Sequence, residues 1–207
     1  MRVGLLLVAG CASAGAPAGG DDVDAAVADT NRPDGAPDGP ASGCAARSSG
    51  VLATWTFSGE PGSQAATAPA TTAQGVVATA IARSAALTAT AGTNSMNASN
   101  WPSSSQRDAT KYYTFSITPP AGCAMDLTGS SIDARSSSTG PTKAAIGTSA
   151  DAYAATQTVS TTAASSPTLS VMSQSAMVEL RVYGFSASGT AGTMRLQTSV
   201  TVSGAIH

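Results

Sequence analysis

Apolar and polar residues alternate with a period of two along much of the chain from Val51 onward. The clearest stretch is MRLQTSVTV, residues 194–202, where Met194, Leu196 and Val200 share one face and polar residues share the other. A period of two is typical of β-strands that bury one face. The same alternation occurs in VLATWTF (51–57), YYTFSIT (112–118) and VELRVYGF (178–185).

The first of these stretches is expected to bury the face formed by Val51, Ala53, Trp55 and Phe57. Turn-forming clusters separate the alternating stretches, among them SGEPGS, TPPAG, SSSTGPT and SASGTAG. A helix is the alternative for VVATAIARSAAL, but its β-branched residues favour a strand. The pattern predicts an all-β fold, a single antiparallel β-sandwich of jelly-roll or Greek-key type with about eight to ten strands.

The first fifty residues have a different character. Met1 and Arg2 precede a short apolar run, Val3–Ala9, which is typical of a signal peptide and too short to cross a bilayer. An ordinary strand or buried helix is the alternative, but no amphipathic segment follows. Beyond it the chain is rich in Ala, Gly, Pro and Asp and is expected to be a disordered linker. The predicted organisation is therefore a signal peptide (1–10), a linker (11–50) and a β-sandwich domain (51–207).

The end of the apolar run carries a family resemblance. Val8-Ala9-Gly10-Cys11 is similar to the lipobox of bacterial lipoproteins, in which the chain is cut before the cysteine and that cysteine is acylated. The resemblance implies a secreted protein that is held in a lipid bilayer at the bacterial cell envelope by acyl chains on Cys11. Two or more such chains anchor a soluble domain stably. The signal is short for this class, which leaves open a start further upstream.

Two further cysteines remain if Cys11 is lipidated. Cys44 lies at the end of the linker and Cys123 lies in PPAGCAMDL, a turn that leads into a predicted strand. An even number of cysteines in a secreted protein predicts a disulfide bond between them. Two buried free thiols are the alternative. A zinc site is not expected, because the sequence contains one histidine and no Cys-x-x-Cys.

A second resemblance covers most of the predicted domain. The stretch from YYTFSITPPAG to SADAY, followed by VELRVYGFSASGTAGTMRLQTSVTVSG, resembles the β-sandwich of bacterial PEP-CTERM-type surface proteins. Gln197-Thr198 stands where that family often has Asp-Asn, and the chain ends at His207 without the family's apolar sorting tail, which the lipid is expected to replace. The matching positions are Ile132, Asp133, Arg135, Gly140, Pro141, Thr142, Asp151, Tyr153, Arg181, Tyr183, Gly184, Gly192, Thr193 and Arg195.

Composition narrows the classes of function. Charged residues make up 11% of the chain, and the predicted domain has nearly equal numbers of acidic and basic residues. It therefore lacks the basic surface that nucleic-acid binding requires, and no nucleic-acid partner is expected. A Ser-His-Asp triad is not expected in the predicted domain, because the single histidine of the sequence is its last residue, His207.

The carboxylates of the predicted domain do not suggest catalysis. Asp133 and Arg135 are two residues apart on one predicted strand, as are Glu179 and Arg181, so each pair shares a face and is expected to form a structural ion pair. The sequence predicts a non-catalytic protein with no metal site and no cofactor. A structural Ca²⁺ ion bound by Asp side chains and turn carbonyls stays open, although no spacing requires one.

Two hypotheses for function remain. The composition favours a structural or surface-display domain without a dedicated small ligand. The alternative is a carbohydrate-binding or adhesion module whose partner is a polysaccharide or another envelope component, with Trp101, Tyr112 and Tyr153 as the candidate residues that stack on sugars. Trp101 lies in the polar segment NASNWPSSS and could instead anchor a loop against the sandwich.

Overall fold

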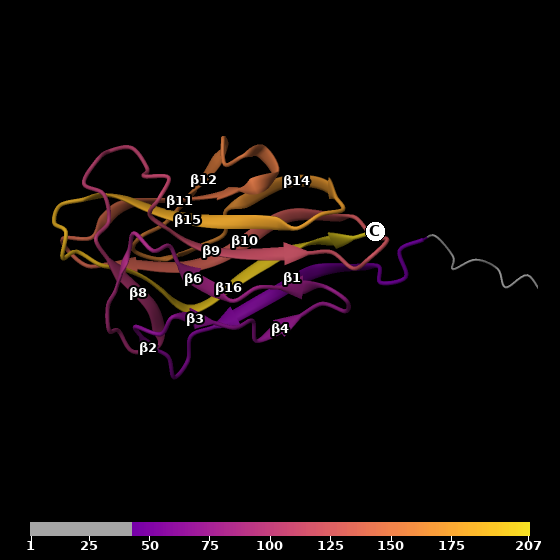
Figure 1. The fold of residues 1–207 in the computed structure, drawn as a ribbon, viewed down its shortest axis with the longest axis horizontal. Coiled ribbons are helices and arrows are strands. Elements are labelled where there is room, and N and C mark those ends of the chain that lie inside the picture. The colour runs from indigo at the N-terminus through magenta and orange to yellow at the C-terminus, as the bar shows by residue number, and fades with distance from the viewer. Residues whose placement is uncertain (1–42) are drawn as a thin grey trace, which may run out of the picture. The chain divides into compact units, whose positions relative to one another are not determined.

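The computed structural model describes residues 43–207, and Figure 1 shows that the long strands of this part form two stacked sheets. In this part of the chain there are sixteen strands, one short 3-10 helix and no α-helix. The elements are β1(Ser48–Thr56), β2(Pro61–Gly62), β3(Ala66–Thr67), β4(Thr71–Thr72), β5(Val77–Ala78), β6(Ile81–Arg83), β7(Thr88–Ala89), β8(Ser95–Ser99), β9(Tyr112–Thr118), β10(Met125–Ser136), β11(Pro141–Thr148), η1(Ser149–Asp151), β12(Thr156–Val159), β13(Ala164–Ser165), β14(Thr168–Gln174), β15(Val178–Ala187) and β16(Met194–Ile206).

The strand order is that of a jelly roll. In the first sheet β14 and β13 pair with one edge of β10, which pairs with β16, which in turn pairs with β1 and β8. In the second sheet the order is β12-β11-β15-β9-β6-β3. The long strands from β8 to β16 alternate between the two sheets, so each buries one face against the other sheet. The prediction of an all-β sandwich is confirmed.

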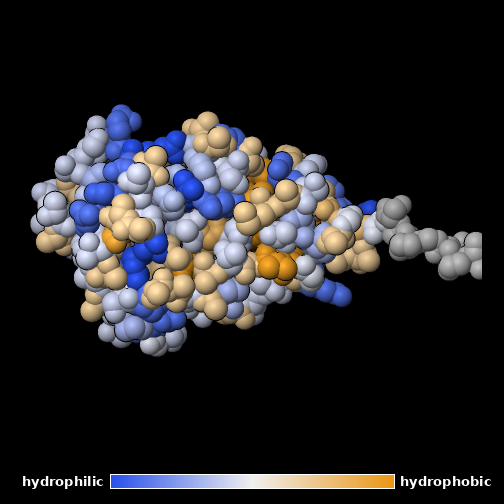
Figure 2. All heavy atoms as spheres, in the orientation of Figure 1, coloured by the Kyte–Doolittle hydropathy of each residue, from blue (hydrophilic) through white to orange (hydrophobic). Residues whose placement is uncertain are grey.

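The core forms between the two sheets from the residues that the alternation places inward. Trp55, Phe57, Leu196, Val200 and Val202 are fully buried, as are the inward residues of β9 and β15. The outer surface has no single apolar face on the side drawn in Figure 2, where polar and apolar residues are interspersed. Among residues 43–207 there is no helix long and apolar enough to span a membrane.

One predicted inward residue is on the surface. Val51 is 54% exposed, whereas its neighbour Leu52 is fully buried. The pairing of β1 with β16 shifts by one residue between Val51 and Ala53, which is a β-bulge. A bulge reverses the side-chain alternation on one side of it, so the expectation that Val51 faces the core was wrong.

The predicted disulfide bond is confirmed. Cys44 and Cys123 are bonded with a Cα–Cα distance of 4.5 Å across a sequence separation of 79 residues. The bond joins the segment before β1 to the turn between β9 and β10. β1 itself begins at Ser48, before the expected domain start at residue 51. The expected signal peptide, Cys11 and most of the expected linker lie outside the described residues.

Candidate functional site

The structure brings two of the candidate aromatic residues together on the outer face of the second sheet. The guanidinium carbon of Arg181, on β15, lies 4.1 Å from the centre of the Tyr112 ring and 4.2 Å from the centre of the Tyr153 ring. Tyr112 comes from the neighbouring strand β9, and Tyr153 comes from the segment after η1. Both rings therefore make cation–π contacts with one arginine.

Glu179 fixes the position of that arginine. Its Oε1 atom accepts hydrogen bonds from Arg181 Nε at 2.6 Å and from the Tyr153 hydroxyl at 2.7 Å. Burial opposes ionisation of Glu179, but these two hydrogen bonds outweigh it and hold the pKa of the carboxyl below its usual value. Burial and the hydrogen bond to Glu179 raise the pKa of Tyr153. The predicted ion pair is thus present as part of a larger cluster.

This aromatic cluster is closed by a second arginine. The guanidinium carbon of Arg107 lies 5.1 Å from the centre of the Tyr183 ring, and the same side chain donates a hydrogen bond to the carbonyl of Tyr153. Tyr183 is only 2% exposed beneath these groups. Because Arg181 covers one face of Tyr112 and one face of Tyr153, those two faces cannot stack on a sugar. The cluster mainly holds the loops to the sheet.

Trp101 does not form part of a surface site. Its indole is 2% exposed, and Nε1 donates a hydrogen bond of 2.9 Å to the carbonyl of Ala98. The ring packs 5.4 Å from that of Tyr113, and a Cβ atom at Gly184 would lie only 3.0 Å from it. Of the two alternatives for Trp101, the structure therefore supports the one in which the residue anchors a loop, and the hypothesis that its ring stacks on a ligand is wrong.

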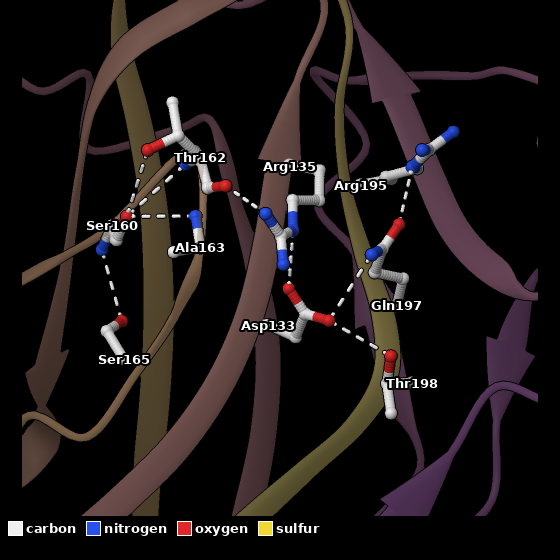
Figure 3. Close-up of polar contacts among 9 residues, drawn as sticks. All are labelled: Asp133, Arg135, Ser160, Thr162, Ala163, Ser165, Arg195, Gln197 and Thr198. Atoms are coloured by element: carbon white, nitrogen blue, oxygen red, sulfur yellow. Dashed lines mark hydrogen bonds and ion pairs between the residues drawn. The ribbon is translucent and has the colours of Figure 1, made fainter.

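A polar network on the outer face of the first sheet contains the other predicted ion pair (Figure 3). Asp133 Oδ1 accepts a hydrogen bond of 2.7 Å from Arg135 Nε, and Oδ2 accepts hydrogen bonds from Gln197 at 3.3 Å and from Thr198 at 3.0 Å. Burial disfavours the Asp133 carboxylate, but these donors outweigh it and lower the pKa. Arg135 also donates to the carbonyl of Thr162.

The carboxylates of Asp133 and Glu179 are both engaged in contacts within the protein. Both oxygens of Asp133 accept hydrogen bonds, and Glu179 is bound by Tyr153 and Arg181. Within residues 43–207 no three His, Cys, Asp or Glu side chains cluster closely enough to hold a metal ion. Gln197 and Thr198 act as hydrogen-bond donors to Asp133.

A shallow groove on the outer face of the second sheet has the side chains for ligand binding. It runs between β11, β12 and the end of β15, and Phe185, Lys143, Ala145, Thr156 and Thr158 line it. Lys143 on β11 is the cross-strand partner of Phe185 on β15, and Ala145 is the partner of Thr158 on β12. The small side chain of Ala145 leaves space between the aromatic ring and the threonine-bearing strand.

The sequence contains a signal for this groove. The alternation in VELRVYGF places Val178, Leu180 and Val182 inward, so Phe185 falls on the outer face with Arg181. The threonines of the opposite wall come from β12, whose sequence TQTV buries only Val159 and does not stand out from the surrounding Ser and Thr residues. The sequence of one wall does not show which residues form the other, because that depends on how β11 pairs with β12 and β15.

Comparisons of the chain with protein-family models, with curated proteins and with solved structures each find no match. Inferences about the function of the protein therefore rest on its own residues and contacts.

Proposed function

We propose that this chain is a secreted lipoprotein that presents a non-catalytic β-sandwich at the bacterial cell envelope, where the domain has a structural or surface-display role. The observation that carries the proposal is the Cys44–Cys123 disulfide bond. Structural disulfides are kept in oxidising compartments and are rare in the cytosol. The lipobox-like sequence Val8-Ala9-Gly10-Cys11 supplies the anchor in this proposal.

The contacts of the charged residues support a non-catalytic role. Asp133 and Glu179 use their oxygens to hold neighbouring strands and loops, and their partners Arg135 and Arg181 are bound in the same networks. General acid–base catalysis needs a group whose proton can be transferred to a bound substrate. These carboxylates instead have lowered pKa values and are held ionised by their donors.

Replacement of the proposed lipid attachment residue tests the anchor. The Cys11→Ser variant should move from the membrane fraction to the soluble extracytoplasmic fraction of the native host, and the domain should keep its melting temperature. Ser13→Ala, two residues further along, is the matched control and should stay with the membrane. Mass spectrometry should find acyl chains on Cys11 of the wild-type protein. An unmodified Cys11, or a Cys11→Ser variant that remains in the membrane fraction, would overturn the lipoprotein proposal.

Carbohydrate binding is the second candidate, and the groove of Phe185 favours it. The groove contains both an aromatic ring, which offers an apolar surface for the C–H face of a sugar, and the threonines of β12, whose hydroxyl groups can bind sugar hydroxyls. Phe185 replaces Trp101 as the candidate residue that stacks on a sugar, because the Trp101 ring is buried. Retention of the wild-type protein on polysaccharide, and loss of retention in Phe185→Ala, would favour this candidate over pure display.

A further inference from the structure

The groove of Phe185 contains a single charged side chain, that of Lys143. The lining residues include no Asp or Glu. Within the described part of the chain, the Lys143 ammonium takes part in no ion pair and donates no side-chain hydrogen bond. By contrast Lys111, the other lysine of the sequence, has its Nζ atom 3.5 Å from Asn100 Oδ1. Lys143 therefore brings an unpaired positive charge to the groove.

Strand pairing places Lys143, which carries this charge, directly opposite Phe185. Lys143 and Phe185 are opposite each other on β11 and β15 and both belong to the outer face. Side chains at directly opposed positions have Cβ atoms about 5 Å apart, which is close to the width of a sugar ring. A sugar that stacks on Phe185 would therefore hold the substituents at its rim within reach of the flexible lysine side chain.

We propose that the groove binds an acidic polysaccharide with one negative charge on each sugar, of the kind that uronate residues provide. The C–H face of a uronate ring packs on Phe185 and its carboxylate pairs with the Lys143 ammonium. The hydroxyl groups of Thr158 and Thr156, which lie one strand further away on β12, bind hydroxyl groups of this sugar and of the next sugar in the polymer. The inference rests on the second candidate function, carbohydrate binding. It adds that the bound glycan is anionic.

The other features of the groove agree with a single charge per sugar. Thr142, Thr156, Thr158 and the segment 160–162 supply neutral hydroxyl groups, so the groove has no arginine fork or second cation that would favour a more highly charged polyanion. The domain as a whole is close to neutral, and long-range attraction for polyanions is weak. The preference for an acidic sugar then comes from Lys143 itself.

The experiment measures binding of the purified full-length Cys11→Ser chain to two polymers with one carboxylate on each sugar, polygalacturonate and alginate, and to their methyl-esterified forms. Esterification removes the charge and keeps the sugar ring. We expect at least one acidic polymer to bind, and its ester to bind at least about tenfold more weakly, because esterification removes the charged partner of the Lys143 ammonium. Lys143→Gln should remove this difference. Lys111→Gln, the same change elsewhere, should preserve it.

Variants of the aromatic residue separate this inference from carbohydrate binding in general. Phe185→Ala should lose binding to both the acid and the ester, and Phe185→Leu, which keeps the apolar volume, should also bind weakly while retaining the melting temperature. Equal binding of the wild type to acid and ester would overturn the inference and leave carbohydrate binding standing. Binding to none of the polymers would overturn both. Equal losses in Lys143→Gln and Lys111→Gln would indicate non-specific attraction and would also overturn the inference.

Discussion

At the scale of single residues, the two tryptophans occupy similar environments. Trp55 is fully buried, packs 4.8 Å from Phe115 and donates a hydrogen bond of 3.0 Å to the carbonyl of Thr79. Trp101 is buried against Tyr113 and donates to the carbonyl of Ala98. The first comes from a regular strand and the second from a loop, yet both indoles combine core packing with a satisfied N–H group.

Replacement of Trp101 should therefore destabilise the fold. Trp101→Ala removes a buried ring and leaves a cavity next to Tyr113, which should lower the free energy of unfolding by about 3–5 kcal/mol. Urea denaturation followed by circular dichroism measures this loss. Trp55→Ala is the reference and should show a loss of similar size. A Trp101→Ala protein within about 1 kcal/mol of wild type would contradict the anchoring role, because such small losses are typical of surface positions.

The position of Trp101 shows which residue properties the sequence could predict. The polar segment NASNWPSSS predicts that Trp101 lies in a loop, and it does. The direction of its ring, however, depends on Gly184, more than 80 residues away, where a Cβ atom would meet the ring. The two ion pairs were predictable because Asp133 and Arg135, like Glu179 and Arg181, are two residues apart on one strand. The spacing of two residues on one strand can be read from a sequence, whereas the packing of Trp101 against a glycine far away in the chain cannot.

At the scale of elements, the alternation of apolar and polar residues predicts the central strands of the two sheets but not their edge strands. β9, β15 and β16 bury several bulky apolar residues each, so their period of two is clear. The segment that forms β12 and β14 consists mostly of Ser, Thr and Ala, and only Val159, Leu169 and Val171 in these two strands are buried. An edge strand buries little surface and therefore needs few apolar residues, which weakens its signal.

Reduction of the disulfide bond should destabilise the sandwich at one end. The bond ties the start of β1 to the turn before β10, and it closes a loop of 79 residues. The chain-entropy model gives a stabilisation of about 4.5 kcal/mol for a loop of this length. A reductant should thus lower the melting temperature measured by calorimetry. The double variant Cys44→Ser, Cys123→Ser should melt at the reduced temperature and be insensitive to reductant.

An unchanged melting temperature after complete reduction, verified by thiol labelling of Cys44 and Cys123, would contradict this role of the bond. The β1–β16 pairing offers an independent readout, because Ser48 and Ser49 are paired with Ile206 and Ala205. Amide hydrogen exchange at this end of β1 should accelerate on reduction, and exchange in the central strands should change less.

At the scale of the whole molecule, the charged groups act in a few separate networks on an otherwise neutral surface. Four carboxyl groups of the described chain have lowered pKa values, those of Asp108, Asp126, Asp133 and Glu179. Burial opposes the shift at all four groups, most strongly at Asp133 and Glu179, and hydrogen bonds to the ionised form outweigh it in each case. The Asp126 and Asp133 contacts lie on the first sheet and the Glu179 contacts on the second, so protonation of these groups weakens contacts in both sheets.

Acidification should therefore lower the melting temperature of the domain. A carboxyl group whose pKa is lower in the folded state binds fewer protons there than in the unfolded chain, so its contribution is present above the unfolded pKa of about 4 and is lost as the pH falls through the folded pKa. The melting temperature should be nearly constant between about pH 5 and pH 7 and should fall below about pH 4. Calorimetry across this range measures the curve.

The contribution of Asp133 can be isolated from that of the other carboxyl groups. Asp133→Asn replaces the ionised acceptor of Arg135, Gln197 and Thr198 by a neutral amide, so the variant should melt at a lower temperature at pH 7 and lose less stability on acidification than wild type. Glu60→Gln removes a carboxylate whose side chain makes no hydrogen bond or ion pair with the described residues, and its curve should parallel that of wild type. A melting temperature that rises on acidification, or an Asp133→Asn curve with the wild-type slope, would contradict a stabilising role for the ionised Asp133 network.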